Sequence, residues 1–332
     1  MTKLPWKTQK QAFQEALVYI KGRKEGTITS LKTPWEKVNE ATLDGFEWQS
    51  TNIIGGRPGT GKTAVKDQLI REAFGLNPVD NMRCLEFSLE MVAKVSAVRG
   101  FSSFVGRSYK YLCSADGEIS DEDSAKCLEY AKMMVKYPID VVEEAPTVEG
   151  FEKIIRQYMA HYAVKSVNKE GKEITTYKKT IITLDHSLLL EGKNRNDMLN
   201  ALGAVLTKLK RIYPIVFIIL SQLNRSIDHP ERNEDGKYGN YVLDSDIFGS
   251  DALLQHADTV IGLNRPGKQK IRFYGPERYI VPDETLLVMH FLKSRNGVNG
   301  LAFFKTQFEQ MKIAVCPTPA QQESRRGGIG TT

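Results

Sequence analysis

The stretch Gly56-Arg57-Pro58-Gly59-Thr60-Gly61-Lys62-Thr63 decides the fold of this chain. It has a glycine, four further residues and then Gly-Lys-Thr, which is the phosphate-loop pattern. A short apolar run at 51–54 precedes it and predicts a buried strand, and residues 64–74 predict a helix. A strand, a glycine-rich turn and a helix N-terminus together present backbone N–H groups and positive charge to a triphosphate. The sequence therefore predicts a nucleotide-binding loop at the start of an α/β unit.

The residue types within this stretch suit contact with phosphate. Gly56, Gly59 and Gly61 lack a Cβ, so the backbone can approach the phosphate oxygens closely. Lys62 is expected on the β- and γ-phosphates, and the Thr63 hydroxyl is expected on Mg²⁺. The whole stretch is predicted to bind the nucleotide, including the residues between the glycines, Arg57, Pro58 and Thr60.

A dinucleotide-binding loop is the main alternative for this stretch. Gly59-x-Gly61-x-x-Ala64 fits a loose dinucleotide fingerprint, and Glu86 lies near the place, about 20 residues on, where an acid would bind the ribose. The Lys-Thr pair inside the loop argues against that reading. A strand, turn and helix without a ligand would need neither the glycines nor the lysine. We therefore interpret the stretch as a triphosphate site.

Composition places the chain among globular proteins without identifying a partner. Hydrophobic residues make up 41% of the 332 positions and charged residues 26%, which is ordinary for a chain with a buried core. The net charge of +6 is compatible with a nucleic-acid partner but does not require one. The four cysteines have no paired spacing, so we expect reduced, buried thiols rather than a zinc site or disulfide framework. No apolar run has the length of a membrane span, and we expect a cytoplasmic protein.

Short apolar runs predict the strands of a mainly parallel sheet. They follow the phosphate-loop strand at residues 84–88, 138–142, 181–184, 215–220 and 255–262. Helical patterns lie between them at 89–104, 121–136, 147–162 and 197–212, with Ser88, Ser120 and Thr147 as N-caps of the first three. Continuous apolar runs between helices are typical of a parallel sheet covered by helices on both faces, so the predicted fold class is α/β. Two later runs, 286–292 and 301–305, predict a strand pair.

The chain divides into three predicted parts. Residues 1–30 contain a helical pattern at 8–21, closed by Gly22, whose apolar face either packs on its own domain or reaches a neighbouring subunit. Residues 31–316 form the nucleotide-binding domain. Residues 317–332 are rich in Gly, Arg, Gln and Thr, and we expect them to be disordered.

Two polar segments are expected to be surface features of the domain. Residues 165–179 centre on a turn signal and predict an exposed hairpin or loop, which is either a solvated insertion or a nucleic-acid contact. Residues 225–251 are polar and contain glycines, and they predict a mobile loop.

Three polar residues follow strand ends, where ligands bind in such sheets. Asp185 is predicted to hold Mg²⁺, although a strand-end aspartate can also cap a loop. Glu90 is predicted to follow the strand next to the phosphate-loop strand and to act as general base; the alternative is a first-turn acid that complements its helix dipole. Gln222 is predicted to hydrogen-bond the γ-phosphate, or else it only closes a buried strand.

Lys293 and Arg295 are candidates for stabilising the transition state. They lie two residues apart on a predicted strand and so point to the same face. Charge that develops on the γ-phosphoryl group requires such cations, and an arginine finger raises the rate by about 10³–10⁵-fold. Because both residues lie far from the phosphate loop in the sequence, they are predicted to come from a neighbouring subunit. The alternative is a surface charge pair.

Four stretches together resemble the DnaB-type hexameric replicative helicases. The phosphate loop is one, and the others are Phe87-Ser88-Leu89-Glu90-Met91, Ser221-Gln222-Leu223-Asn224-Arg225 and Lys293-Ser294-Arg295-Asn296-Gly297. Asp185-His186-Ser187-Leu188 matches the family's metal-binding strand more loosely. The order and spacing of these stretches agree with the family from about residue 10 to about residue 315.

The resemblance implies a RecA-like P-loop NTPase core in a homo-hexameric ring. Such a ring uses ATP and Mg²⁺ to move 5′ to 3′ along single-stranded DNA and to unwind duplex. The resemblance also implies that Glu90 is the catalytic base, that Gln222 lies on the sensor strand and that Lys293 and Arg295 act in trans. The helix at 8–21 would dock on the adjacent subunit, and a primase or helicase loader would be a further partner.

Two features depart from the family's pattern. The family's N-terminal domain, which meets primase, has no counterpart in this sequence; bacteriophage versions are similar in this respect, which implies a viral source and the host cytoplasm. The family's Arg-Glu-Ser-Gly run after the sensor strand is replaced by Asp246-Ile247-Phe248-Gly249-Ser250, which has no arginine. DNA contact at this place would then depend on backbone N–H groups near Gly249.

Two other functions use the same nucleotide-binding residues. One is a RecA-like recombination or loading ATPase that coats single-stranded DNA without unwinding it. The other is a non-motor scaffold that uses ATP only to assemble. The combination of acid, sensor and finger residues argues against the scaffold.

Overall fold

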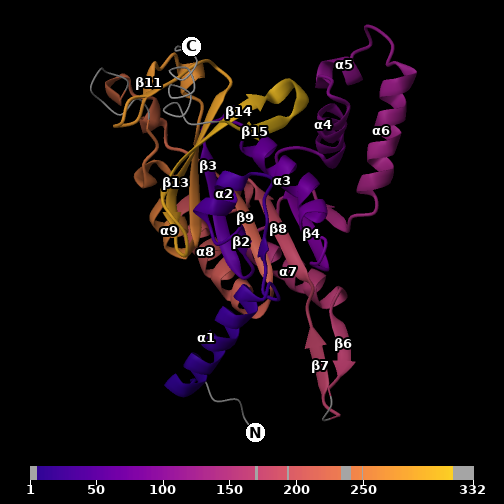
Figure 1. The fold of residues 1–332 in the computed structure, drawn as a ribbon, viewed down its shortest axis with the longest axis vertical. Coiled ribbons are helices and arrows are strands. Elements are labelled where there is room, and N and C mark those ends of the chain that lie inside the picture. The colour runs from indigo at the N-terminus through magenta and orange to yellow at the C-terminus, as the bar shows by residue number, and fades with distance from the viewer. Residues whose placement is uncertain (1–5, 169–170, 193, 233–240, 249, 317–332) are drawn as a thin grey trace, which may run out of the picture.

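A nine-stranded sheet lies at the centre of the part of the chain that the structure describes (Figure 1). This computed structural model describes residues 6–168, 171–192, 194–232, 241–248 and 250–316. The strand order is β15-β14-β13-β10-β3-β9-β8-β4-β5. Neighbouring strands from β10 to β5 are parallel, and β13, β14 and β15 are antiparallel additions beside β10. The expected mainly parallel sheet is confirmed.

The elements follow one another in the order that the sequence patterns predicted. The strands of the large sheet are β3 (Ser50–Gly56), β4 (Met82–Ser88), β5 (Ile139–Val142), β8 (Lys179–Asp185), β9 (Ile215–Gln222), β10 (Thr259–Asn264), β13 (Leu286–Ser294), β14 (Gly300–Gln307) and β15 (Lys312–Val315). Small two-stranded pairs are formed by β1 (Ser30–Leu31) with β2 (Phe46–Glu47), β6 (Val164–Val167) with β7 (Glu173–Thr176), and β11 (Phe273–Tyr274) with β12 (Tyr279–Ile280). The helices are α1 (Gln9–Lys24), α2 (Glu36–Ala41), α3 (Lys62–Leu76), α4 (Ala93–Val105), α5 (Tyr109–Cys113), α6 (Asp121–Met134), α7 (Val148–His161), α8 (Arg195–Ile212) and α9 (Ser250–His256).

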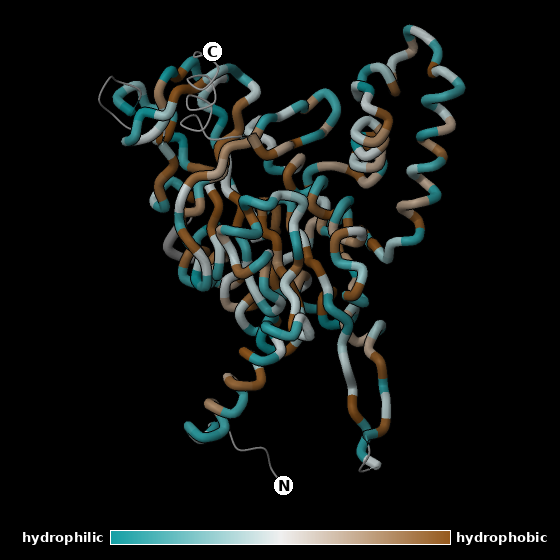
Figure 2. The backbone as a smooth tube through the Cα atoms, in the orientation of Figure 1, coloured by the Kyte–Doolittle hydropathy of each residue, from teal (hydrophilic) through white to brown (hydrophobic). Residues whose placement is uncertain are grey.

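Helices cover both faces of the sheet, as the continuous apolar runs predicted. Residues of α7, α8 and α9 share one core with β3, β4, β8 and β9, and residues of α2 and α3 share a second core on the opposite face. Figure 2 shows the hydrophobic residues concentrated in the central strands. The strand β9 is buried over nearly its whole length, because side chains on both of its faces meet helices.

The position of β4 differs from the sequence-based expectation. β4 was expected beside the phosphate-loop strand β3, but β9 and β8 lie between them. Apolar patterning identifies strands without identifying their neighbours. The two intervening strands are almost wholly buried, whereas β5 beyond β4 is only partly buried and forms the edge of the sheet.

The helix after β4 begins later than the sequence suggested. Ser88 was expected to cap a helix from residue 89, but α4 begins at Ala93 and the Ser88 hydroxyl donates to the Met91 carbonyl. A hydroxyl engaged in this way does not accept a bond from a helix N–H, so residues 89–92 form a non-helical link. By contrast, Ser120 and Thr147 cap α6 and α7 as expected.

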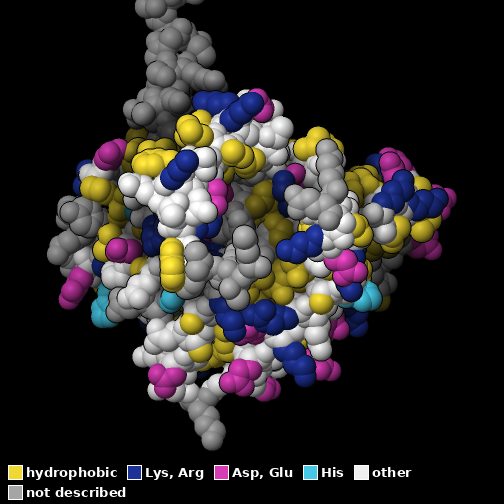
Figure 3. Space-filling view, turned by 90° about the horizontal axis from the view of Figure 1, so that it is seen from below, with side chains coloured by type: hydrophobic (Ala, Val, Ile, Leu, Met, Phe, Trp, Pro, Cys, Tyr) yellow, Lys and Arg dark blue, Asp and Glu magenta, His cyan; other side chains and the backbone are white. Residues whose placement is uncertain are grey.

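Three groups of elements project from the covered sheet (Figure 1). They are α1, the β6–β7 hairpin, and the arm formed by α4, α5 and α6. The hairpin confirms the exposed insertion expected at 165–179, because every described residue of both strands is exposed. Seen from the end from which α1 and the hairpin project, hydrophobic and basic side chains lie side by side on the surface (Figure 3).

The first helix is longer than expected, and its apolar face is exposed. It continues through Gly22 and ends at Lys24. Gly22 is needed for packing, because a Cβ there would lie 2.7 Å from the Ile28 side chain. Phe13 and Leu17 on the apolar face are 62% and 67% exposed, so within this chain that face does not pack on its own domain.

Smaller differences from the sequence-based expectations are local. Gln255 belongs to α9, and the strand after it begins at Thr259. Of the cysteines, which were all expected to be buried, Cys84 is buried but Cys113 is exposed. Residues 225–251 contain short 3₁₀ turns and the start of α9 where they are described, and the tail expected to be disordered, 317–332, lies outside the described residues.

Among the described residues, no helix combines the length and apolar character needed to cross a bilayer.

Candidate nucleotide-binding site

The phosphate loop and the predicted polar residues meet at one edge of the sheet. Strand pairing places Gly56 beside Gln222 on β3 and β9, and Ser88 beside Asp185 on β4 and β8. All four strands are parallel, so their carboxyl ends lie at the same edge. The expectation that Asp185, Gln222 and Glu90 gather near the loop is met, even though β4 is not next to β3.

The phosphate loop has a backbone shape that depends on its glycines. Gly59 and Gly61 have φ angles of 75° and 103°, in the left-handed region that favours glycine. A Cβ on Gly56 would lie 2.4 Å from the Thr60 hydroxyl oxygen, which itself donates to the Arg57 carbonyl at 2.8 Å. The loop is therefore a tight turn at the N-terminus of α3, where a phosphate gains from the unpaired N–H groups.

Lys62 lies folded back within the loop. Its Nζ donates to the carbonyl oxygens of Gly56 at 2.8 Å and of Arg57 at 3.3 Å. Burial lowers the pKa of Lys62, and the nearby carboxylates of Asp185 and Glu90 oppose that shift. An ammonium bonded to neutral carbonyls in a partly desolvated place is available for a stronger, anionic partner.

Asp185 and Thr63 fit the requirements of a magnesium site. Asp185 is 2% exposed, and its Oδ1 has no hydrogen-bond partner within the described part of the chain. Burial raises the pKa of Asp185, whereas the Lys66 ammonium and the Thr63 hydroxyl within its reach lower it. The described residues contain no cluster of three His, Cys, Asp or Glu side chains that could hold a metal. One carboxylate and one hydroxyl suit Mg²⁺, which keeps waters and takes phosphate oxygens as its other ligands.

Glu90 lies in the non-helical link between β4 and α4. The link is bonded to the end of β8, because the Leu89 N–H donates to the Asp185 carbonyl at 3.2 Å. Glu90 is exposed, and its carboxylate lies near enough to Lys62 and His186 to oppose the lowering of their pKa values by burial. The alternative role as a first-turn helix acid is wrong, because α4 begins three residues later.

Gln222 connects the site to the segment that follows β9. Its Nε2 lies 3.2 Å from Nε2 of His186, whose pKa is lowered by burial. Its backbone carbonyl accepts from the Phe248 N–H at 2.8 Å, and Leu223 beside it forms a bridge with Ile247. A displacement of Gln222 would therefore be transmitted directly to the segment around residue 247.

Arg57 makes a second connection to that segment. Its Nε donates to Asp228 at 2.7 Å, and Asp228 ends the 3₁₀ turn Arg225–Asp228 just after β9. The phosphate loop is thus tied to the polar segment after the sensor strand by an ion pair that sequence patterns did not predict.

Arg265 and Phe308 were also missed by the sequence analysis. The guanidinium carbon of Arg265 lies 4.6 Å from the centre of the Phe308 ring, and a Cβ on Gly61 would meet that ring at 2.5 Å. A cavity of about 230 Å³ extends from the phosphate loop along Arg265 and Lys268. A guanidinium and an aromatic ring beside a phosphate site are typical contacts of a flat base. The one signal in the sequence is a pair of basic residues just after the strand at 259–264.

Lys293 and Arg295 lie away from this site. Lys293 pairs with Val260, which pairs with Ile53 of the phosphate-loop strand. Gly56 is three residues further along that strand, so it lies about 10 Å further on and roughly 10 Å to the side. β13 runs antiparallel to β10, and its chain therefore leads away from the phosphate loop. Neither cation can reach a phosphate in this loop of the same chain.

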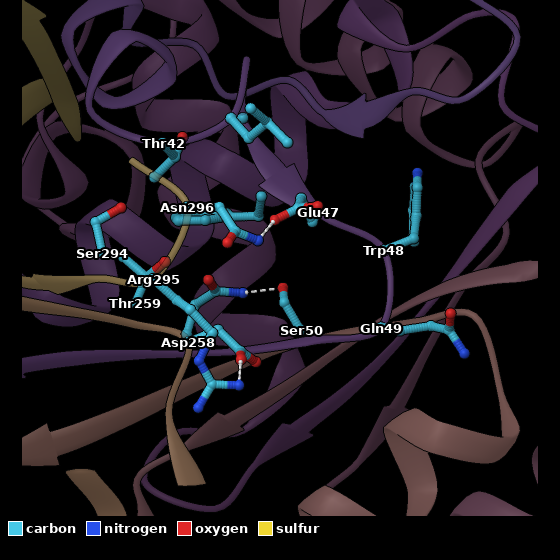
Figure 4. A pocket seen from close by; sticks show the side chains of 14 residues that line it. Thr42, Glu47, Trp48, Gln49, Ser50, Asp258, Thr259, Ser294, Arg295 and Asn296 are labelled. Atoms are coloured by element: carbon cyan, nitrogen blue, oxygen red, sulfur yellow. Dashed lines mark hydrogen bonds and ion pairs between the residues drawn. The ribbon is translucent and has the colours of Figure 1, made fainter. Parts of the chain in front are cut away.

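Arg295 borders a separate cavity of about 190 Å³ (Figure 4). Arg295 pairs with Asp258 at 2.9 Å, and the next residue, Asn296, donates to Glu47 at 2.5 Å. Lys293 Nζ donates to the Leu254 carbonyl at 2.6 Å. Arg295 lies just past the end of β13 rather than on the strand, so the expectation that both cations share one strand face is wrong for Arg295.

Comparison with known proteins identifies the family. A family model described as the DnaB-like helicase C-terminal domain matches residues 30–313. The chain belongs to this DnaB-like family. The match covers the sheet, the phosphate loop, the link with Glu90 and both finger candidates, and it begins after α1.

Related proteins and structures agree with this assignment to the DnaB-like family. Replicative DNA helicases DnaB from two Helicobacter pylori strains are each 27% identical to this chain, over 72% of its length and 44% of theirs. The chain thus spans less than half the length of these relatives. A solved structure described as an ATPase domain superposes with a TM-score of 0.74 at 21% identity, covering 92% of this chain and 98% of that one. A DnaB-like replicative helicase studied with primase gives 0.72 at 20% identity, covering 91% and 66%. The RecA-like fold expected from the sequence is confirmed.

Proposed function

We propose that this chain is the ATPase motor of a replicative DNA helicase that works as a ring of six copies. One observation supports the proposal: the phosphate loop and the two candidate finger cations lie at opposite ends of the same sheet. The phosphate loop, Asp185, Glu90 and Gln222 share one edge, whereas Lys293 pairs with Val260 near the other end of β10 and Arg295 lies just beyond that end. Head-to-tail contact between copies would bring the two halves together at every interface.

The residues of one chain would bind the triphosphate and prepare the attacking water. The phosphate-loop N–H groups and Lys62 would hold the β- and γ-phosphates, and Arg265 with Phe308 would contact the base. Glu90 is exposed on a non-helical link rather than held in a helix, so it can reach a water near the γ-phosphate and accept its proton. Gln222 would hydrogen-bond the γ-phosphate and move when that group leaves.

Asp185 and the Thr63 hydroxyl would hold Mg²⁺. The ion neutralises charge on the phosphate oxygens when it is bound. Lys293 and Arg295 of the next copy would stabilise the charge that develops on the γ-phosphoryl group. Hydrolysis would therefore depend on assembly.

The apolar face of α1 supports a head-to-tail ring. The last turns of α1 are tied to their own domain, since Tyr19 donates to Glu47 at 2.6 Å and Arg23 donates to Ser30 at 2.9 Å. The preceding turns project with Phe13 and Leu17 exposed. We infer that these turns dock on the adjacent copy, and that residues 1–30 act as a linker to the domain at 31–316.

The segment tied to Gln222 and Arg57 is the proposed link to single-stranded DNA. Backbone bonds join residues 246–248 to the end of β9, and Arg57 holds the turn at Asp228. Loss of the γ-phosphate would then shift this segment and move a bound strand. Primase or a helicase loader is the proposed further protein partner.

The test is strand displacement on forked DNA with ATP and Mg²⁺. Two substrates are compared, one with only a 5′ single-stranded arm and one with only a 3′ arm. Unwinding that requires the 5′ arm supports a helicase with 5′ to 3′ movement. Turnover stimulated by single strands without unwinding of either substrate, together with filaments rather than rings in electron microscopy, would instead indicate a DNA-coating ATPase.

A further inference from the structure

A buried lysine lies directly behind the proposed metal site. Lys66 follows Lys62 by one helical turn on α3 and is 0% exposed. Its ammonium contacts the Glu86 carboxylate, lies 3.0 Å from Asp67 Oδ1 and lies 3.8 Å from Asp185 Oδ2. One cation thus joins three carboxylates from α3, β4 and β8.

The energetics of this cluster set it apart from a surface ion pair. An unpaired ammonium in a protein interior is strongly destabilising, so Lys66 is tolerated at a sheet-facing position only because carboxylates meet it. Glu86 is the main partner, and it would be equally costly to bury alone. Two apolar side chains could fill the same space without the cost of burying charge. We therefore expect the charge of Lys66 to have a role other than packing.

The geometry of the cluster points toward the metal. Glu86 on β4 pairs with Thr183 on β8, and two residues further along the same strands Ser88 pairs with Asp185. Lys66 therefore contacts β4 and β8 close to the end of β8 that carries Asp185. Lys66 approaches Asp185 Oδ2, whereas Asp185 Oδ1 has no hydrogen-bond partner in the described chain. One ammonium and three ionised carboxylates carry a formal charge of −2, which a divalent cation at Asp185 would balance.

We propose that Lys66, held by Glu86, is a positioning residue for the magnesium site. It holds Asp185 by Oδ2 and leaves Oδ1 directed to the ion beside Thr63. This inference rests on the proposed function of the site as a Mg²⁺–nucleotide site. Partners that orient a metal ligand in this way affect metal affinity by about 10–100-fold when they are removed.

The experiment measures metal dependence without turnover. A fluorescent, non-hydrolysable ATP analogue is bound first in EDTA and then with rising Mg²⁺, for the wild-type chain and for Lys66→Met. The substitution should raise the Mg²⁺ concentration at half effect by about 10-fold or more, while binding in EDTA changes little. An unchanged Mg²⁺ dependence in a folded Lys66→Met protein overturns the inference.

A double variant separates positioning from folding. Lys66→Met leaves Glu86 buried without its partner, so its unfolding midpoint is expected to fall. Lys66→Met/Glu86→Leu removes both charges and should restore much of the stability, because a buried pair can be replaced by apolar groups. If the double variant is folded and still requires more Mg²⁺, Lys66 positions Asp185. If its Mg²⁺ dependence returns to the wild-type value, Lys66 has only a structural role.

A matched control lies at the start of β8, the strand that ends at Asp185. Lys179 begins β8 and donates to Asp80 at 2.6 Å and to Thr29 at 2.7 Å. Lys179→Met removes a less buried ion pair far from Asp185, and its Mg²⁺ dependence should equal that of the wild-type protein. Failure of the wild-type chain to bind the analogue at all would reject the proposed function itself, which is a different outcome from an unshifted Mg²⁺ titration.

Discussion

At the scale of single residues, Asp185 and Glu90 lie near the phosphate loop of their own chain, whereas Lys293 and Arg295 lie away from it. Arg295 is 55% exposed and pairs with Asp258 in its own chain. An exposed pair of this kind contributes little to stability, so it can be exchanged for a phosphate contact at a subunit interface. The predictions for Arg295 and Glu90 follow from their separation in space.

Arg295→Ala is expected to abolish most ATP hydrolysis while nucleotide binding changes little. The missing guanidinium would cost about 10³–10⁵-fold in turnover, whereas the phosphate loop is untouched. Steady-state ATPase assays and binding of a fluorescent analogue measure the two effects, with the exposed Arg211→Ala as the control.

Mixing two inactive variants tests whether the arginine acts in trans. Rings that combine Arg295→Ala with Lys62→Ala copies contain some interfaces with an intact loop facing an intact arginine. Such mixtures should recover part of the turnover. If they stay inactive although each variant assembles, or if Arg295→Ala alone retains full turnover, the assignment in trans is wrong.

Glu90→Gln is expected to bind ATP and stall. The amide keeps the size of the side chain but cannot accept a proton, and loss of a general base costs about 10²–10⁴-fold in rate. Single-turnover hydrolysis measures the effect. The exposed helical Glu72→Gln serves as the control, and a normal rate for Glu90→Gln would place the base elsewhere.

At the scale of elements, α1 is a helix anchored at one end. Its last turns are bound through Tyr19 and Arg23, and on its earlier turns the side chains of Phe13 and Leu17 are exposed. Exposed apolar side chains on a projecting helix favour contact with another chain.

Phe13→Asp/Leu17→Asp is expected to break the ring without unfolding the domain. Both side chains are already exposed, so the unfolding midpoint should change little, while the assembly falls apart. Light scattering during gel filtration measures the mass. The control Gln11→Asp/Gln14→Asp adds two negative charges about one helical turn apart on the polar side of α1, and equal dissociation of both variants would show that added charge rather than the apolar face is responsible.

At the scale of the whole molecule, buried histidines make stability depend on pH. His290 is buried on β13, where its ring lies 4.5 Å from the Tyr241 ring. Burial lowers the pKa of His290 in the folded chain. As the pH falls through the ordinary histidine value of about 6.5, the unfolded chain binds a proton that the folded chain resists. The stabilisation is therefore present above that pH and lost below it.

His290→Asn is expected to flatten this dependence. The wild-type free energy of unfolding should fall on acidification with a slope of up to about 1.4 kcal/mol per pH unit from this residue, and the variant should lack that contribution. Urea unfolding at about pH 7.5 and about pH 5.5 measures the difference. The exposed His229→Asn is the control, and equal slopes for the wild-type and His290→Asn proteins would contradict the prediction.

The local elements were predictable because their causes are local. The phosphate loop is identified by glycines with left-handed backbone and by Lys62, and Ser120 caps its helix through a contact three residues away. The start of α4 was not predictable, because a serine hydroxyl can either accept from a helix N–H or donate to a nearby carbonyl, and Ser88 donates to the Met91 carbonyl.

The fold class, the nucleotide loop and the residues around it could be predicted from the amino-acid sequence alone. These residues follow parallel strands, and the carboxyl ends of parallel strands meet at one edge of the sheet. The tertiary structure was needed to show that β9 and β8 separate β4 from β3, that Arg265 and Phe308 border the loop, and that Lys66 lies 3.8 Å from Asp185. It also decided that Lys293 and Arg295 cannot reach the phosphate loop of their own chain. The reason is physical: apolar periodicity records whether a residue is buried, whereas strand order and long-range contacts depend on which buried surfaces pack together.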